Sequence, residues 1–546
     1  MNIDNVILRI LNQRNITGEK EIEEYLSPTP KLTYDPFLLL NMKEGVDLIL
    51  DTAKKGGKIC IYGDYDADGV TSVTILETVF KYLTDNVVHF VPSRFEDGYG
   101  LNKKAIKNIK EKGVDLIVTV DCGITSVEEV EYAKEIGLDI IVTDHHSVPE
   151  HKPNCLIINP KQEECSYPYK HLAGCGIAFK MAQAIQRAAD LPHQIIRKVL
   201  DVVAIGTIGD IVPLTGENRT IVKYGIRQLE KSNNKGISAL KSRIFKDSDH
   251  ISSEQVSFGI VPHLNAAGRM ESARIGIELF LEENDIKADE IANHLVGLNT
   301  KRKDVQEEVY ENAIELYHEK YEDMLFPMIV MNDAHEGITG IVAGKMKDYC
   351  YKPVAILTDT GDGYLKATCR GIEKVDIYQV LNESRDLYVK FGGHKGACGF
   401  TISKENYPEL VENTAAYMKR FDDDVFEPEV NYDMELDGSE LTLELVKELD
   451  KLEPFGCCNE KPYFLLKNCQ IVNIRYMGKQ RNHMRITVNL DGFRGLNCIL
   501  FNFNDEQDEL VQSNKVVDIC GSLQINQWNN QESIQVLVSD VKRKIN

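Results

Sequence analysis

The sequence Lys58-Ile-Cys-Ile-Tyr-Gly-Asp-Tyr-Asp-Ala-Asp-Gly69 decides the fold class of this chain. Its first five residues have the pattern of a buried strand, a Gly/Asp loop follows, and a helix is expected from about Thr71. Further strands are expected at 87–91, 114–120 and 138–143, with helical segments between them. This alternation predicts an α/β domain with a doubly wound parallel sheet. In such sheets the ligand site lies outside the C-terminal ends of the strands.

Acidic and imidazole side chains follow three of these strands. Any one of them has a simpler interpretation, since an Asp-rich turn is often solvated, Asp121 could cap a helix and His145 could sit in a capped turn. At one edge of a doubly wound sheet, however, they would converge, and so many carboxylates are costly without cations. The sequence therefore predicts a metal site at this edge, with Asp66, Asp68, Asp121, Asp144, His145 and His146 in it.

The identity of these side chains indicates which metal to expect. Mixed carboxylate and imidazole ligands suit Mn²⁺ or Mg²⁺, and Zn²⁺ is less favoured because no thiolate is offered. The cluster has more acidic side chains than one ion requires as ligands, which favours two divalent ions about 3.5–4 Å apart. Such a pair of ions is suited to phosphoester hydrolysis. Asp210 closes the apolar run 206–213 and is a further candidate, with a helix C-terminal turn as the alternative.

Length and composition restrict the class of protein. The 546 residues suggest three to four domains at roughly 150 residues each. A net charge of −22 argues against a histone-like basic coat, although a local basic stripe could still bind nucleic acid. No apolar run approaches the ~20 residues of a membrane span, and the start lacks the features of a signal peptide. Thirteen scattered cysteines without a C-x-x-C pair indicate reduced thiols, so a cytoplasmic protein is expected.

The chain divides into six expected segments. A helical lead-in (1–45) precedes the α/β domain (46–285), and apolar residues at steps of 3, 4 and 7 predict a long bridging helix (286–320). A second α/β domain (321–425) and an acidic linker (426–452) follow, with the surface of a helical hairpin as the alternative for the acidic stretch. Short strands with Gly/Asn turns predict a small β-barrel at 453–546.

An ordered set of motifs resembles the DHH phosphoesterase superfamily and, within it, the RecJ family of single-strand-specific exonucleases, over nearly the whole chain. The motifs span residues 63–72, 120–124, 144–146, 172–180, 209–214, 264–270 and 392–400. The resemblance implies a DHH catalytic domain, a DHHA1-type substrate-binding domain and an oligonucleotide-binding (OB) barrel.

The resemblance also implies roles for the acidic edge. Asp144 would orient a neighbouring ligand and His146 would contact the scissile phosphate, while Asp64 is either a further ligand or an acceptor behind the ligands. Many relatives with small-molecule substrates have a His where this chain has Tyr62, which implies that one metal is held more weakly or through water. The implied metal ligands, which are also the catalytic residues together with His146, are Asp66, Asp68, Asp121, His145 and Asp210.

Phosphate-binding residues are expected in the second domain. The segment Gly392-Gly393-His394-Lys395-Gly396 is predicted to be a flexible loop whose backbone N–H groups approach an anion, with tight turns as the alternative. His335 is expected to open a helix whose N-terminus would favour phosphate. Relatives often carry Trp before that His, where this chain has Ala334, so a stacking surface is lost. Arg370 stands where the family has a phosphate-binding Arg; for it and for Arg269 a surface salt bridge is the alternative.

The barrel carries a small positive charge in an otherwise acidic chain. Its basic and aromatic residues fit a single-strand groove. The only tryptophan, Trp528, is either a stacking platform or a plug of the barrel interior. The candidate DNA-binding residues on one expected hairpin are Arg475, Tyr476, Lys479, Arg481, His483 and Arg485.

Taken together, the residues and the resemblance imply a metal-dependent, single-stranded-DNA-specific 5′→3′ exonuclease. It would release 5′-mononucleotides in DNA repair and recombination, as a monomer, with a single-strand-binding protein and a helicase as expected partners. One alternative is a DHH-family phosphodiesterase acting on short oligonucleotides or cyclic dinucleotides, although such relatives usually lack the barrel. Another is a non-catalytic DNA-binding subunit, which the intact acids and histidines disfavour.

Overall fold

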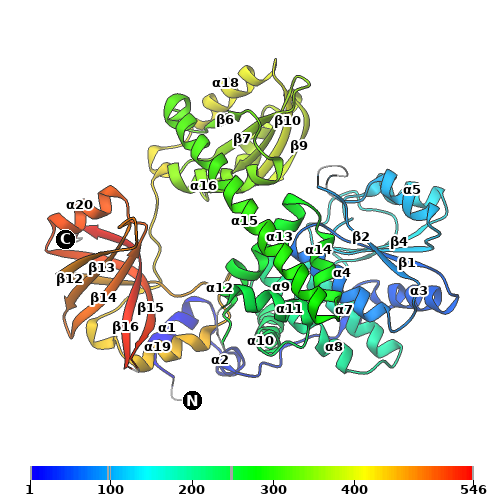
Figure 1. Cartoon of the computed structure of the whole chain (residues 1–546), viewed down its shortest axis with the longest axis horizontal. Helices are drawn as coiled ribbons and strands as arrows, with labels where there is room; N and C mark the ends of the chain where they lie inside the picture. Colours follow the sequence, from blue (N-terminus) through cyan, green and yellow to red (C-terminus); the bar gives the residue numbers. More distant parts are fainter. Residues whose placement is uncertain (1–2, 95–97, 99, 246–249, 530, 544–546) are drawn as a thin grey trace.

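The computed structural model describes residues 3–94, 98, 100–245, 250–529 and 531–543. Figure 1 shows three bodies: a domain around the first sheet, a second lobe joined to it by a long helix, and a barrel on the other side. Among the described residues, no helix is both long enough and apolar enough to cross a lipid bilayer.

The first sheet is parallel throughout, with strand order β2-β1-β3-β4-β5. Alternate strand residues face two different cores, one shared with α3, α4 and α7 and the other with α5 and α6. Helices therefore cover both faces, which confirms the predicted doubly wound fold. The elements are α3 Met42–Lys54, β1 Ile59–Tyr62, α4 Ala67–Phe80, β2 Val87–Phe90, α5 Lys103–Glu111, β3 Leu116–Thr119, α6 Val127–Glu135, β4 Asp139–Thr143, β5 Leu156–Ile158 and α7 Gly174–Ala188.

A helical layer completes this domain and leads out of it. α15, Asp285–Leu316, is the long helix predicted from the apolar spacing, and it joins the first domain to the second lobe (Figure 1). The other helices are α8 Gln194–Lys198, α9 Leu200–Gly209, α10 Gly216–Glu230, α11 Lys235–Ile244, α12 Ser253–Gln255, the π-helix η2 Val256–Ile260, α13 Val261–Met270 and α14 Arg274–Leu281.

The second lobe has a mixed sheet of order β6-β7-β8-β10-β9. The segment 392–396, predicted to be a flexible loop, is not one: Gly392 to His394 end strand β9 and pair with β10, and only Lys395 and Gly396 form the turn. Backbone pairing ordered these glycines although they have no side chains to pack. The elements are β6 Met328–Met331, α16 Glu336–Cys350, β7 Val354–Asp359, β8 Tyr364–Arg370, α17 Ile377–Asn382, β9 Tyr388–His394, β10 Ala397–Ser403 and α18 Tyr407–Met418.

The C-terminal strands form a barrel, as predicted. β12 pairs with both β13 and β15, which closes the sheet of order β11-β12-β13-β14-β16-β15. The elements are β11 Met434–Glu435, β12 Phe464–Met477, β13 His483–Leu490, β14 Phe493–Phe501, α20 Asp505–Ser513, β15 Val516–Trp528 and β16 Gln531–Arg543.

Two segments expected to be peripheral contribute to the barrel's core. α1, Asn5–Gln13, and α2, Glu19–Leu26, pack there with α19, Leu443–Leu449. The acidic segment 426–452 is thus a linker only in its first part, because β11 pairs with β12 and α19 buries its apolar side chains. The Asp and Glu side chains of this segment lie on the surface, and for this reason its composition alone predicted a solvated stretch.

A buried ion pair anchors the N-terminal segment to helices α7 and α10 of the first domain. Lys180 on α7 and Glu217 on α10 are both 0% exposed, with Nζ and Oε1 2.9 Å apart. Lys180 also donates to the carbonyl of Tyr34 at 2.6 Å, and Thr33 donates its hydroxyl to Glu217 at 2.8 Å. Because both charges are fully desolvated, each depends on the other.

We expect Lys180→Met to lower the free energy of unfolding by about 3–5 kcal/mol, because it leaves the Glu217 carboxylate buried without its partner. The double variant Lys180→Met/Glu217→Gln should recover part of that loss. Lys43→Met, which breaks an exposed pair with Asp47, is the control and should leave the free energy of unfolding nearly unchanged, because solvent screens that pair. Urea unfolding followed by circular dichroism measures all three; equal losses in the two lysine variants would contradict the assigned role.

Candidate metal centre

The predicted acidic edge is where the first sheet's strands end. Asp64 and Asp66 lie on the loop after β1, and Asp66 caps α4 by accepting the N–H groups of Asp68 and Gly69 at 3.0 Å each. Asp121 follows β3 in a left-handed backbone conformation. Asp144, His145 and His146 follow β4, and Asp210 ends α9.

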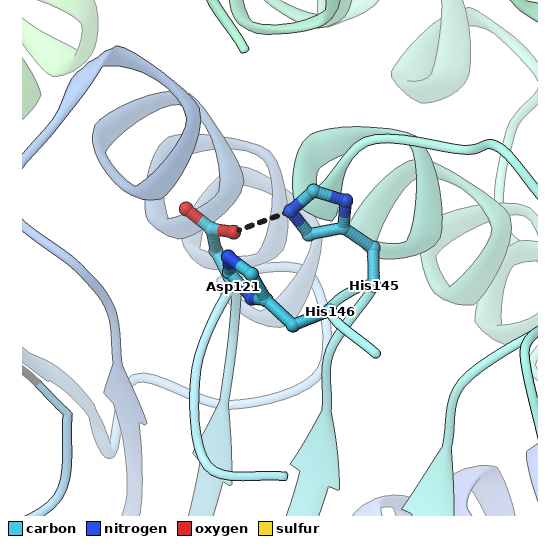
Figure 2. A group of neighbouring side chains, drawn as sticks. All are labelled: Asp121, His145 and His146. Atoms are coloured by element: carbon cyan, nitrogen blue, oxygen red, sulfur yellow. Dashed lines mark ion pairs between the residues drawn. The ribbon is translucent and has the colours of Figure 1, made fainter. Parts of the chain in front are cut away.

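His145 lies at the middle of this cluster. Its Nε2 is 3.2 Å from Asp121 Oδ1, 3.5 Å from Asp210 Oδ2 and 4.0 Å from Asp68 Oδ2. Figure 2 shows Asp121 and His145 facing each other, with His146 beside them. Three overlapping groups have ligand atoms within 4.8 Å of one another: Asp121, His145 and His146; Asp68, His145 and Asp210; and Asp64, Asp66 and Asp121.

Several buried polar atoms of this cluster have no hydrogen-bond partner among the described residues. They are Asp64 Oδ1, Asp121 Oδ1, the Nε2 of His145 and Asp210 Oδ2. Buried polar atoms are nearly always satisfied in folded proteins. Carboxylate oxygens and a neutral imidazole aimed at a common centre are suitable ligands for divalent cations, so the residues present fit the predicted metals.

Burial and mutual repulsion displace the pKa values of these groups. Burial, followed by the charge of Asp66, raises the pKa of Asp64 to about 8 and that of Asp68 to about 7. Burial and then Asp68 raise the pKa of Asp210 to about 9. Burial, with His146 beside it, lowers the pKa of His145 to about 3, which keeps its ring neutral and able to bind a metal. A bound cation would offset the carboxylate repulsion.

Asp144 faces the backbone rather than the centre. Its Oδ1 accepts the N–H of His145 at 2.7 Å and the Nδ1 of His146 at 2.6 Å, and its Oδ2 accepts the N–H of Ile124 at 3.0 Å. Burial alone would raise the pKa of Asp144, but the hydrogen bonds from His146 lower it below its usual range. This geometry suits the orienting role expected of Asp144.

Two supporting groups escaped prediction from the sequence. The N–H groups of Gly174 and Cys175, at the start of α7, donate to the two oxygens of Asp68 at 2.7 and 2.8 Å. A Cβ at Gly174 would lie 2.6 Å from the Cβ of Asp121. Asn265 accepts the N–H of Ala67 at 2.8 Å. Both belong to motifs noted in the sequence, which showed no function for them because their partners are distant along the chain.

Arginines gather where the two lobes meet. Arg269 on α13 donates to the carbonyl of Gly337 in the first turn of α16, at 2.8 Å. Burial, together with the charges of Arg94, Arg302 and Arg370, lowers the pKa of Arg269 to about 10. These four basic residues therefore share one region, into which the sequence had placed only Arg269 and Arg370. Two of them, Arg94 and Arg302, were missed.

The other expected phosphate-binding residues lie around this region. His335 caps α16, its Nδ1 accepting the N–H of Gly337 at 3.2 Å. Arg370 and His394 both pair with Ala397 across the sheet, so they lie on strands either side of β10. His394 and Lys395 are exposed at the hairpin tip, where the His394 ring accepts the N–H of Gly396 at 3.3 Å.

The barrel residues are grouped as predicted on one hairpin, where Arg475 faces Arg485 across β12 and β13. Tyr476 is partly engaged, since its hydroxyl donates to Asp508 and Arg481 lies over its ring at 5.3 Å. Trp528 is 74% exposed at the end of β15, which rules out its role as a plug of the barrel interior.

Comparisons with known proteins agree along the chain. Family models described as the DHH family N-terminal domain, the DHHA1 domain and the RecJ OB domain match residues 58–207, 325–420 and 432–540. A single-stranded-DNA-specific exonuclease RecJ of Haemophilus influenzae is 31% identical over 98% of this chain and 95% of its own length. The corresponding Bacillus subtilis protein is 35% identical over 99% of this chain and 68% of its own length.

Solved structures give the same result. The RecJ of Thermus thermophilus in complex with Mn²⁺ matches with a TM-score of 0.83 and 26% identity, over 100% of this chain and 79% of that one. A structure described as exonuclease RecJ bound to manganese matches with a TM-score of 0.63 and 30% identity, over 71% of this chain and 97% of that one.

We expect Mn²⁺ to raise the melting temperature of the wild-type chain and to do so much less in Asp121→Asn. Without the ion, Asp121→Asn should melt at the same temperature as the wild type or at a higher one, because the substitution removes one of several mutually repelling carboxylates. An ion at 100 times its Kd stabilises by about 2.7 kcal/mol. Asp139→Asn, at the opposite end of β4, is the matched control and should respond like the wild type. Equal Mn²⁺ shifts in all three proteins would contradict a metal centre at Asp121.

Proposed function

The chain belongs to the RecJ family, and from that premise we propose that it is a metal-dependent, single-stranded-DNA-specific exonuclease that releases 5′-mononucleotides in the 5′→3′ direction. The observation that carries the proposal is the set of buried carboxylate and imidazole atoms around His145 that have no hydrogen-bond partner among the described residues. We propose Mn²⁺ or Mg²⁺ as the ions, since carboxylates with one imidazole suit them.

We assign the metal-holding role to Asp66, Asp68, Asp121, His145 and Asp210, with Asp64 beside them. When bound, the ions would act as Lewis acids and lower the pKa of water for attack on phosphorus. The chain's own part is positional: the N–H groups of α7 hold Asp68, and Asp144 holds His146 at the rim. His146 is 45% exposed in its side chain, so it can reach a phosphate oxygen.

Phosphate binding is proposed for the arginines between the lobes. Arg269 carries positive charge close to Asp66 of the acidic centre, Arg370 lies near Arg269, and Arg269 already contacts α16 in the other lobe. A phosphodiester bound between the metal centre and these arginines would have cations on one side and guanidinium groups on the other. His335, the 392–395 strand end and the barrel hairpin would hold the rest of the strand, by backbone and phosphate contacts that carry no base sequence.

Partners and place of action follow the same reasoning. A helicase would supply the single strand this reaction needs, and a single-strand-binding protein would present it. We propose that the chain acts as a monomer in the cytoplasm on DNA under repair or recombination. The barrel favours long strands as substrates over cyclic dinucleotides.

The direct test is digestion of labelled strands with Mn²⁺. We expect a 5′-labelled single strand to release labelled mononucleotide first, while a blunt duplex resists and a 5′ overhang is trimmed to near the junction. Asp121→Asn should lower turnover by at least about 100-fold, equivalent to about 2.7 kcal/mol, while strand affinity by fluorescence anisotropy changes little. Asp139→Asn is again the control.

Two results would count against this proposal. Wild-type turnover in Asp121→Asn would show that the reaction occurs elsewhere. Attack on blunt duplexes at the single-strand rate, or digestion from 3′ ends, would contradict the proposed selectivity and polarity.

The barrel hairpin can be tested separately. Arg475→Ala/Arg481→Ala should weaken single-strand binding and reduce the slope of log affinity against log salt by about 1.4, since each lost phosphate contact contributes about 0.7. Trp528→Ala should lower affinity about 5- to 100-fold with an unchanged slope, because stacking is not ionic. Lys54→Ala/Lys55→Ala, two exposed charges at the end of α3, is the control. Unchanged affinity and slope in the arginine variant would mean that the hairpin does not bind the strand.

A further inference from the structure

Cys457 and Cys458 form the two central residues of a tight turn. Gly456 and Asn459 exchange backbone hydrogen bonds at 3.0 Å in each direction, which leaves the two cysteines between them. Their sulfur atoms are 3.8 Å apart. All thirteen cysteines fall within the described residues, and Cys458 alone is exposed, with Cys457 half-buried beside it.

This turn is packed against the loop that follows Asp210. The N–H of Leu214 donates to the carbonyl of Cys457 at 2.8 Å. A Cβ at Gly456 would lie 2.6 Å from Leu214, so the two segments are in close approach. A second contact from the catalytic domain comes from Ser253 of α12, which donates its hydroxyl to the carbonyl of Phe455 at 2.6 Å. The cysteine turn is therefore part of the junction between the barrel and the catalytic domain.

We propose that Cys457 and Cys458 are a redox modification site: a peroxide converts them to a vicinal disulfide, which loosens the contact with Leu214 behind the metal centre. The exposed Cys458 thiol reacts with the peroxide O–O bond to give a sulfenic acid and one water. The Cys457 thiol then displaces the second water and forms the S–S bond. Two thiols lose two electrons and two protons, and one peroxide becomes two waters.

The effect on Leu214 follows from the geometry of the ring that a disulfide between Cys457 and Cys458 closes. An S–S bond is about 2.05 Å long, so the sulfur atoms must approach each other by about 1.8 Å. The eight-membered ring contains the peptide bond between the two cysteines, and the carbonyl of that peptide is the acceptor for Leu214. Cys458, the third residue of the turn, has a φ of 57°, which is a left-handed conformation. β-Turns with positive φ and with negative φ at the third residue differ by a rotation of the peptide between the second and third residues. In the proposed oxidised form the peptide rotates in this way, which turns its carbonyl away from Leu214.

The expected loss is partial because other groups hold the same loop. Tyr169 donates its hydroxyl to the carbonyl of Pro213 at 3.1 Å, and Asn218 donates to it at 3.0 Å. Oxidation thus removes one of several hydrogen bonds behind Asp210, and we expect a reversible loss of about 3- to 10-fold in turnover rather than inactivation.

The first experiment concerns the chemistry and does not depend on the proposed exonuclease activity. The full-length chain is treated with limiting hydrogen peroxide, and intact mass and peptide mapping are measured. We expect a loss of two hydrogens, located within one peptide that contains both residues, and its absence in Cys458→Ser and Cys457→Ser. Cys155→Ser, a half-buried cysteine of the catalytic domain, should oxidise like the wild type. A wild-type chain that gives no such disulfide, or in which other cysteines consume the peroxide, overturns the site.

The second experiment measures consequence and rests on the proposed function. Turnover on a single strand with Mn²⁺ should fall on oxidation and return with dithiothreitol in the wild type and in Cys155→Ser, and stay constant in Cys458→Ser. A disulfide that forms without any change in turnover overturns the coupling to Leu214. If the unoxidised wild type shows no turnover, the proposed function fails, while the mapped disulfide still decides the modification site.

Discussion

Mutual repulsion among buried carboxylates is the constraint around which the catalytic domain is arranged. Asp64, Asp68, Asp121 and Asp210 all have raised pKa values, each because of burial first and neighbouring acids next. The fold offsets part of this cost with backbone dipoles: α4 begins at Asp66, and the N-terminus of α7 donates to Asp68. Those contacts satisfy both oxygens of Asp68, whereas Asp64 Oδ1, Asp121 Oδ1 and Asp210 Oδ2 have no hydrogen-bond partner among the described residues, which is the condition for receiving cations.

Much of this edge could be predicted because of a topological rule. Parallel strands end at the same edge, so acids after β1, β3 and β4 had to meet once the alternation of strands and helices was recognised. Asp210 is different, because it ends a helix rather than a strand, and only the family resemblance placed it in the set. Arg94 and Arg302 were missed because they lie outside the motifs, and their common location arises from the packing of two lobes that no local pattern encodes.

Long-range packing also explains the errors outside the site. Glycine pairs at 392–393 suggested a loop, although strand pairing depends on backbone groups that every residue except proline carries. The N-terminal helices looked like a lead-in, yet they share the barrel's core. Arg219 on α10 is 4% exposed, lies over the Tyr25 ring at 3.9 Å and donates to the carbonyl of Leu452 at 2.8 Å. It therefore joins α10 to α2 and to the segment that leads into the barrel. Deleting the barrel would expose apolar faces of α1 and α2, so point substitutions report its role more cleanly than truncation.

Selectivity for a single strand can arise from this arrangement without any contact to bases. Arg269 connects α13 of the catalytic domain to α16 of the second lobe, so the two lobes are close at the arginine cluster. Even with its pKa lowered to about 10, Arg269 stays charged at neutral pH, opposite an acidic centre that needs cations. A phosphodiester is attracted to the guanidinium groups and to bound cations alike, and it must lie between the lobes to reach both. In the proposed reaction a lone backbone meets that requirement, whereas a duplex would have to bring a second backbone, with its own negative charges, to a place where Arg269 already joins the two lobes through Gly337.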